Sequence, residues 1–263
     1  MLCFEHIPKT AGTSLTSAFQ IHYGKNALNL SKDSLNTIPS NIELIYSHRA
    51  KRTALKSGIN NLQMLTFVRH PVSLVKSHFM HLARSSDVNF IQINLMRKTL
   101  EDYLKQKTFK DFDNGLVRRF SNIDFPYGEC NEDYLKVAIK NLDSYVFIGV
   151  QEFFNESIFS MSKFLNWNSY PIYIKSNKIP AYQRKITGFD ELIIENSAFD
   201  IKLYNYCLDK FEKVFNLSNI YDEEFLAYMK LQEKFNKNFD AGGFAKKYIL
   251  RDLKNKIKGI IVR

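Results

Sequence analysis

Four short apolar runs stand out in the pattern of hydrophobic and polar positions along the chain. They occupy residues 2–6, 42–46, 64–68 and 145–150, and each is bounded by turn-forming or polar residues. Most of them lack the alternation of apolar and polar positions that marks a strand with one solvated face. This pattern predicts strands that are buried on both faces, as in a parallel sheet covered by helices.

Apolar positions at helical spacing separate and follow these runs. They are Leu15, Ala18, Phe19 and His22, then Val72, Val75, Phe79 and Leu82, then Ile158, Met161 and Leu165, then Leu203, Cys207, Phe211 and Val214. Gly24 is suited to end the first predicted helix, and Pro71 to lie in the first turn of the second. The alternation of strands and helices predicts an α/β domain, in which ligands bind where strands end and helices begin.

The end of the chain differs from the rest, so we divide it into a domain over residues 1–218 and an extension over residues 219–263. Residues 225–236 and 244–263 are rich in lysine and helical in pattern, which predicts a basic helical C-terminal extension. The second of these segments is amphipathic. Two readings stay open: it packs its apolar stripe on its own domain, or it makes peripheral contact with an anionic surface such as the inner membrane.

The composition is that of a globular protein, since 45% of the 263 residues are hydrophobic and 24% are charged. No apolar run approaches the roughly 18–20 residues that cross a bilayer. Glu5, His6 and Lys9 interrupt the first apolar stretch, unlike a signal peptide. The three cysteines match no zinc spacing and form no disulfide framework. We therefore expect a cytoplasmic protein whose cysteines are ordinary thiols.

The net charge of +10 favours a polyanionic partner, such as a nucleotide, an acidic glycan, an anionic lipid or a nucleic acid. No zinc-finger, helix-turn-helix or aromatic RNA-binding signature accompanies the charge, so we expect no nucleic-acid partner. A basic anion-binding protein without catalytic activity is the alternative that the charge alone allows.

Residues 4–15 are the most informative stretch, because a predicted strand runs through Pro8 into small and hydroxylated residues and then into a helix. Such a turn presents backbone N–H groups and a helix N-terminus to an anion. Lys9 adds a point charge, and Gly12 lets the chain approach a ligand closely. Hydroxyl donors for phosphate oxygens follow at Thr10, Thr13 and Ser14. Lys9 precedes the glycine, so this is not a Walker A loop. The plainer alternative is that Thr13 or Ser14 caps the helix.

A second candidate anchor follows the third apolar run. Arg69 lies at the end of that predicted strand, where its guanidinium can bind a phosphate through two hydrogen bonds. Ser77 lies eight residues further on, within the next predicted helix, and can reach the same group. Two anchors at separate strand–helix junctions suit a ligand that carries phosphates at both ends.

These two segments resemble motifs of a known family. Residues 8–14 resemble the 5′-phosphosulfate loop of sulfotransferases that use 3′-phosphoadenosine-5′-phosphosulfate (PAPS), and residues 67–71, with Ser77, resemble their 3′-phosphate motif. The likeness is greatest to the carbohydrate sulfotransferases typified by heparan sulfate 2-O-sulfotransferase. Weaker similarities follow in the same order at residues 46–48, 114–118, 145–150 with Glu152, and 183–185, so that the likeness covers roughly residues 2–215.

The resemblance implies a P-loop-like, three-layer α/β fold with a central, mostly parallel sheet. It also implies PAPS as co-substrate, adenosine 3′,5′-bisphosphate as product, and no metal. It assigns the 5′ end of the donor to Lys9, Thr10, Ala11, Gly12, Thr13 and Ser14. It assigns the 3′-phosphate to Arg69 and Ser77, and it puts Arg184 and Lys185 on a late loop that closes over the nucleotide.

Sulfuryl transfer needs a general base, because the acceptor hydroxyl must lose its proton as it attacks sulfur. His48 is the candidate. It follows a predicted strand, and the resembling enzymes carry a Gly-His pair where this chain has Ser47 and His48. Lys9 is expected to stabilise the charge that develops on the bridging oxygen as the bisphosphate leaves. The alternative for His48 is a strand-end histidine with no catalytic role.

The acceptor side of the predicted site is less specific. His78 lies on the helix after Arg69 and is a candidate for acceptor binding. Arg118 and Arg119 could meet a carboxylated or sulfated sugar, or could be solvated surface charges. The likeness favours a carbohydrate or polysaccharide acceptor, and a non-carbohydrate alcohol is the alternative.

Some features depart from the family. The residue after the motif arginine is His70 where the family has aspartate, and the cysteine pair of the animal enzymes is reduced to Cys130. Together with the lack of a membrane anchor, these departures indicate a bacterial or viral type of relative. A P-loop kinase is a competing class, but the sequence has neither Gly-Lys-Ser/Thr nor an acidic magnesium ligand at a predicted strand end.

Overall fold

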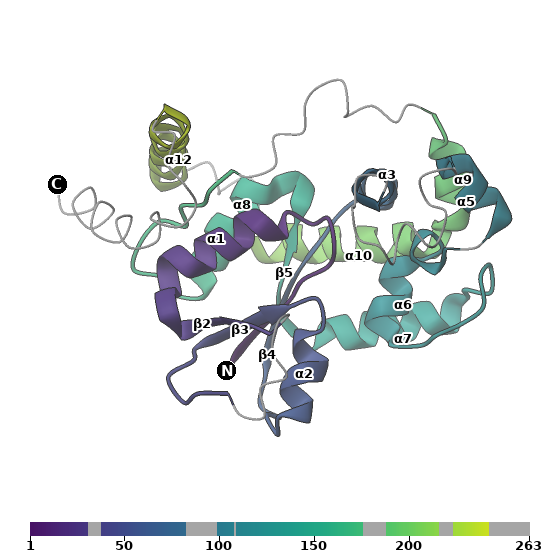
Figure 1. Cartoon of the computed structure of the whole chain (residues 1–263), viewed down its shortest axis with the longest axis horizontal. Helices are drawn as coiled ribbons and strands as arrows, with labels where there is room; N and C mark the ends of the chain where they lie inside the picture. The colour runs from purple at the N-terminus through teal and green to yellow at the C-terminus, as the bar shows by residue number, and fades with distance from the viewer. Residues whose placement is uncertain (31–37, 83–98, 108, 176–187, 216–222, 242–263) are drawn as a thin grey trace.

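Five strands form one sheet at the centre of the computed structural model (Figure 1), which describes residues 1–30, 38–82, 99–107, 109–175, 188–215 and 223–241. The strands are β1 Leu2–Glu5, β2 Ala27–Asn29, β3 Leu44–Ser47, β4 Gln63–Val68 and β5 Tyr145–Val150. They lie in the order β2-β3-β1-β4-β5, and each neighbouring pair is parallel. The prediction of an α/β fold with a parallel sheet is confirmed. Strand β2 was missed, because three residues are too few to show a pattern.

The strands are aligned so that their carboxyl ends meet at one edge of the sheet. Glu5, the last residue of β1, lies opposite Ser47 of β3 and Thr66 of β4. The segments that follow β1, β3 and β4 therefore begin at the same edge of the sheet, although these strands end at Glu5, Ser47 and Val68 along the chain. Ligands of open α/β sheets bind at this edge.

Ten α-helices are resolved within the described residues. They are α1 Gly12–Tyr23, α2 Ala50–Lys56, α3 Pro71–Leu82, α5 Leu100–Gln106, α6 Gly115–Ser121, α7 Glu132–Asp143, α8 Phe154–Phe164, α9 Asp190–Asn196, α10 Ala198–Phe215 and α12 Glu223–Ala241. The four helices predicted within the domain correspond to α1, α3, α8 and α10. Gly24 follows α1 with φ 58°, and Pro71 begins α3, as the sequence predicted.

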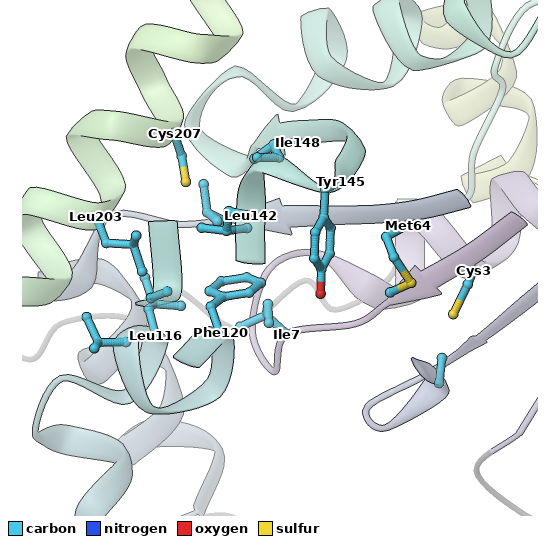
Figure 2. Close-up of a cluster of buried hydrophobic side chains, with 14 of the residues drawn as sticks. Cys3, Ile7, Met64, Leu116, Phe120, Leu142, Tyr145, Ile148, Leu203 and Cys207 are labelled. Atoms are coloured by element: carbon cyan, nitrogen blue, oxygen red, sulfur yellow. The ribbon is translucent and has the colours of Figure 1, made fainter. Parts of the chain in front are cut away.

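Helices cover both faces of the sheet. Adjacent strand residues point to opposite sides, so both faces carry apolar side chains that need to be buried. Cys3 packs with α2, α6, α7 and α10, whereas Phe4 packs with α1, α8 and α12. Figure 2 shows the first of these clusters, in which Tyr145 of β5 lies between Phe120 of α6 and Met64 of β4. Cys3 and Cys207 are buried free thiols, in agreement with the sequence interpretation. A smaller third cluster joins α3 to α5 and α9.

Two neighbouring strands send their helices to opposite faces. Helix α1 follows β1 and packs in one core cluster, while α2 follows β3 and packs in the other. The chain segments that leave β1 and β3 therefore diverge, which is the arrangement that opens a crevice for ligands at the carboxyl edge of a parallel sheet.

The first helix of the C-terminal extension packs against the domain. Phe225 and Tyr228 of α12 are buried against Phe159 of α8. The Gln232 side chain accepts a hydrogen bond from the Tyr173 backbone N–H at 3.0 Å and donates one to its carbonyl at 2.9 Å. The second predicted segment, residues 244–263, lies outside the described residues. Among the helices described, none is both long enough and apolar enough to cross a membrane.

Candidate functional site

The loop between β1 and α1 holds two non-glycine residues in left-handed backbone conformations. Lys9 has φ 67° and Ala11 has φ 61°, backbone angles that residues other than glycine rarely adopt. Ala11 is the N-cap of α1, and its carbonyl accepts hydrogen bonds from the N–H groups of Ser14 and Leu15. Thr13 and Ser14 lie inside a helix that begins at Gly12, so neither is its N-cap residue. The cap itself has no side-chain hydrogen bond.

Thr10 has a structural task in this loop. Its side chain is fully buried, and its hydroxyl donates a hydrogen bond to the Ile7 carbonyl at 2.8 Å. Because its proton is committed within the loop, Thr10 is a poor donor for a phosphate oxygen, contrary to the sequence expectation. Ser14 is only 9% exposed, whereas Thr13 is exposed. Of these two hydroxyl residues, Thr13 is therefore the more accessible to a ligand.

Gly12 is required by the ring of His6. A Cβ atom added at Gly12 would lie 1.7 Å from His6 Nε2 and 2.0 Å from its Cε1. The glycine was expected to allow the approach of a ligand, but within this chain its close neighbour is the imidazole. Strand β1 ends at Glu5, one residue earlier than predicted, so His6 lies just beyond it.

The two candidate anchors lie in one site. Arg69 follows β4, and its Nη1 donates a hydrogen bond to the Lys9 carbonyl at 3.0 Å. Burial lowers the pKa of Arg69, and the nearby Glu152 carboxylate acts in the opposite direction. Arg69 Nε is buried and has no hydrogen-bond partner in the part of the chain that the structure describes. Ser77 lies two turns into α3 and is partly buried.

Glu152 supplies a carboxylate beside Arg69. It follows β5, and its two oxygens accept hydrogen bonds from the His70 backbone N–H at 3.0 Å and the Tyr204 hydroxyl at 3.2 Å. The first bond satisfies an amide at the start of α3, which no intrahelical acceptor can reach. The carboxylate near Arg69 therefore comes from the segment after β5 and not from position 70. The available sequence signal was an acidic residue two positions after a strand.

His48 is held in one tautomer by the chain that precedes the loop. Its Nδ1 lies 2.8 Å from the His6 carbonyl oxygen. Because a carbonyl oxygen only accepts, Nδ1 carries the proton and Nε2 keeps its lone pair. The rings of His6 and His48 stack with centroids 4.3 Å apart and planes 22° apart.

Both stacked histidines are neutral near pH 7. Partial burial lowers the pKa of His48; the hydrogen bond to the His6 carbonyl raises it, and the Arg119 charge lowers it. Burial, together with the charges of His48, Arg119 and Lys9, lowers the pKa of His6 to about 3. The pair therefore offers a neutral imidazole with a defined lone pair, which is the form that a general base needs.

His78 belongs to the same neighbourhood. Burial lowers its pKa, Asp111 raises it from 3.9 Å, and the charges of His81, Lys9 and His48 lower it. Electrostatic interactions therefore link His78 of α3 to Lys9 and His48, while its direct contacts are with Asp111, Phe109 and Phe112.

The two adjacent arginines of α6 have different environments. Arg118 is 10% exposed, forms an ion pair with Asp113, donates from Nε to the Asp113 carbonyl at 2.8 Å, and lies 3.7 Å above the ring of Phe125. Its donors are used within the protein, so Arg118 has little to offer an acceptor, contrary to the sequence expectation. Arg119 instead contacts the carbonyls of His6 and His48.

Arg184 and Lys185 lie outside the described residues. Among the residues that the structure does describe, no three histidine, cysteine, aspartate or glutamate side chains gather into a group that could hold a metal ion. Comparison with known proteins found no family model that matches the chain and no curated protein of significant similarity. The local geometry is therefore the basis for inferring what the site does.

Proposed function

We propose that the protein is a PAPS-dependent sulfotransferase with a P-loop-like core, which transfers a sulfuryl group to a hydroxyl of a carbohydrate. The observation that carries this proposal is the hydrogen bond between Arg69 Nη1 and the Lys9 carbonyl at 3.0 Å. Two anion-binding segments that are 60 residues apart in sequence are thereby adjacent. One nucleotide with phosphates at both ends can engage both.

The residues at this edge of the sheet fit such a nucleotide. The start of α1 and the Lys9 side chain suit the phosphosulfate end, because helix N-termini and cations stabilise anions. The buried Nε of Arg69 lacks a partner in the described chain. Buried polar groups are nearly always hydrogen-bonded, and a 3′-phosphate oxygen would satisfy this one.

The chain's own groups then act on the acceptor and on the leaving group. PAPS supplies the sulfuryl group. His48, neutral and protonated at Nδ1, takes the acceptor's hydroxyl proton on Nε2 as the oxygen attacks sulfur. Lys9 stabilises the negative charge left on the phosphate oxygen of the bisphosphate. His78, which interacts electrostatically with both residues, orients the acceptor in this proposal.

Titration calorimetry with adenosine 3′,5′-bisphosphate tests the donor site. Lys9→Ala and Arg69→Ala should each weaken binding by about tenfold or more, because each removes a charge-assisted contact. Lys140→Ala, which removes an exposed lysine from α7, is the matched control and should leave the affinity unchanged. Unchanged affinity in both site variants, or equal affinity for the bisphosphate and adenosine 5′-monophosphate, would remove the donor-site proposal.

Transfer of radiolabelled sulfate from PAPS tests the activity itself. A screen over acidic and neutral polysaccharides, with simple alcohols beside them, separates a carbohydrate acceptor from the alternative acceptor class. Bisphosphate binding without transfer to any acceptor would favour a binding protein over an enzyme.

A further inference from the structure

One guanidinium joins the two histidine-bearing segments of the site. Arg119 projects from α6, and its Nη2 donates hydrogen bonds to the His48 carbonyl and, at 3.4 Å, to the His6 carbonyl. His6 follows β1 and His48 follows β3, and these strands are neighbours in the sheet. The same His6 carbonyl also accepts the His48 Nδ1–H bond. Arg119 therefore contacts the acceptor atom that fixes the His48 tautomer.

Arg119 is held on its other side by an acidic group. Its Nε lies 3.9 Å from Glu5 Oε1, and Glu5 Oε2 accepts a hydrogen bond from the Tyr145 hydroxyl at 3.3 Å. The Arg119 and Glu5 side chains are only 25% and 14% exposed. A cation at this depth needs a counter-charge and hydrogen-bond acceptors, and it finds both within the protein. Arg119 Nη2 donates to two backbone carbonyls, and Glu5 supplies a counter-charge, while the buried Nε has no hydrogen-bond partner among the described residues.

The helix that carries Arg119 is fixed at its start by reciprocal capping. The Asp200 carboxylate accepts hydrogen bonds from the N–H groups of Leu116 and Val117 at 3.0 and 2.8 Å. In return, Asn114 Oδ1 accepts from the N–H groups of Phe199 and Asp200 at 2.9 and 3.1 Å. Helices α6 and α10 thus cap each other, which limits the freedom of α6 to move relative to the sheet.

We propose that Arg119 is a positioning residue, which clamps the carbonyls of His6 and His48 and so keeps the His48 ring in its Nδ1-protonated orientation. It does not bind the acceptor. This inference rests on the proposed function, because it gives His48 the role of base. The clamp joins the ends of two strands whose relative position determines where the base lies. Small displacements of a base from its reactive geometry lower the reaction rate.

The charge of Arg119 has a second effect on His48. The charged or titratable groups that act on His48 are His6 at the end of β1, His78 on α3 and Arg119 on α6. Neutral His6 exerts little electrostatic effect, and Arg119 disfavours protonation of His48. Removing the guanidinium should therefore loosen the hydrogen bond of His48 to His6 and also remove a positive charge, and these two changes act on the His48 pKa in opposite directions. The tautomer of His48 is the clearer measure of the clamp.

The test begins without donor or acceptor. In Arg119→Met, the fraction of His48 protonated at Nδ1, followed by NMR of its ring nitrogens above the pKa of the ring, should fall relative to wild type. Lys140→Met removes one positive charge from the exposed face of α7 and should leave this fraction unchanged. An unchanged Nδ1-protonated fraction in Arg119→Met would overturn the proposal. The measurement needs no sulfate transfer, so its failure is distinguishable from failure of the proposed function.

Arg119→Lys keeps the positive charge and one donor, and it carries the test if the methionine variant does not fold. Because the positive charge is kept, a fall in the Nδ1-protonated fraction of His48 in this variant reports the lost contacts to the two carbonyls. In the transfer assay, kcat should fall by about ten- to a hundredfold, with KM for the acceptor unchanged. A rise in acceptor KM with unchanged kcat would assign Arg119 to acceptor binding and overturn the proposal.

Discussion

The contact between Gly12 and the ring of His6 allows a sharp test of the loop geometry. A Cβ atom at position 12 would lie 1.7, 2.0 and 2.5 Å from three atoms of the imidazole, closer than any van der Waals contact permits. The ring has little room to retreat, because it stacks on His48 with centroids 4.3 Å apart and lies 6.1 Å from the ring of Phe4. Gly12→Ala therefore has to displace His6 or the loop.

The expected cost follows from the size of this overlap. Forcing one extra carbon into a packed site typically destabilises a protein by about 1–3 kcal/mol. Because the overlap between the added Cβ atom and the His6 ring is large, Gly12→Ala should lie in the upper part of that range. We therefore expect the free energy of unfolding to fall by about 2–3 kcal/mol.

Gly115 provides a matched control within the same chain. Each of these glycines is the first residue of a helix and follows a left-handed N-cap residue, Ala11 with φ 61° or Asn114 with φ 49°. A Cβ at Gly115 would meet nothing within 4 Å. Gly115→Ala should therefore leave stability unchanged or raise it by up to about 1 kcal/mol, through reduced entropy of the unfolded chain and better helix propensity.

Urea unfolding of the single and double variants measures the effect. If the clash with His6 is the cause, the His6→Ala background should remove most of the Gly12→Ala penalty, with a coupling energy of about 1–3 kcal/mol. The reasoning is wrong if Gly12→Ala costs no more than Gly115→Ala. It is also wrong if the penalty is the same with and without the His6 ring.

The remaining predictions concern the base and the helix caps. His48→Ala should lower turnover by about 10²–10⁴-fold with unchanged affinity for adenosine 3′,5′-bisphosphate, and wild-type turnover would contradict its role. Because the pKa of His48 lies below 6.5, its base form predominates at neutral pH, and turnover should fall as the pH drops through that lowered pKa; a pH–rate profile with its acid limb above 6.5 would oppose this assignment. Asp200→Ala leaves the N–H groups of Leu116 and Val117 without their acceptor and should lower the free energy of unfolding by about 2 kcal/mol, measured by urea titration; no loss would mean that the caps are dispensable.

Much of the fold could be predicted because burial leaves a local record in the chain. The run at residues 145–150 coincides with β5, and the apolar positions from Leu203 to Phe211 lie on the buried face of α10. Both patterns arise from the side-chain period of a single element. They carry no information on which strands are neighbours, so the order β2-β3-β1-β4-β5 was not predictable from them.

The candidate site, too, could be predicted only in part from the sequence. The sequence located the loop at residues 8–14, Arg69 and His48, because each follows an apolar run. It did not reveal that Glu152 serves the start of α3, or that Arg119 rather than Arg118 faces the histidines. Adjacent residues of one short helix differ in direction by about 100°, and only packing decides which of them points to the sheet.

The sequence by itself therefore indicated four of the five strands, the helices α1, α3, α8, α10 and α12, and the places where polar groups follow the strands, since these patterns depend on residues that are near one another in the chain. Only the tertiary structure decided that the Lys9 carbonyl meets Arg69, that His6 stacks on His48 and covers Gly12, and that α6 reaches both histidines. The physical reason is that these contacts depend on strand order, register and helix direction. Those features minimise the free energy of the whole chain and are not encoded in any single segment.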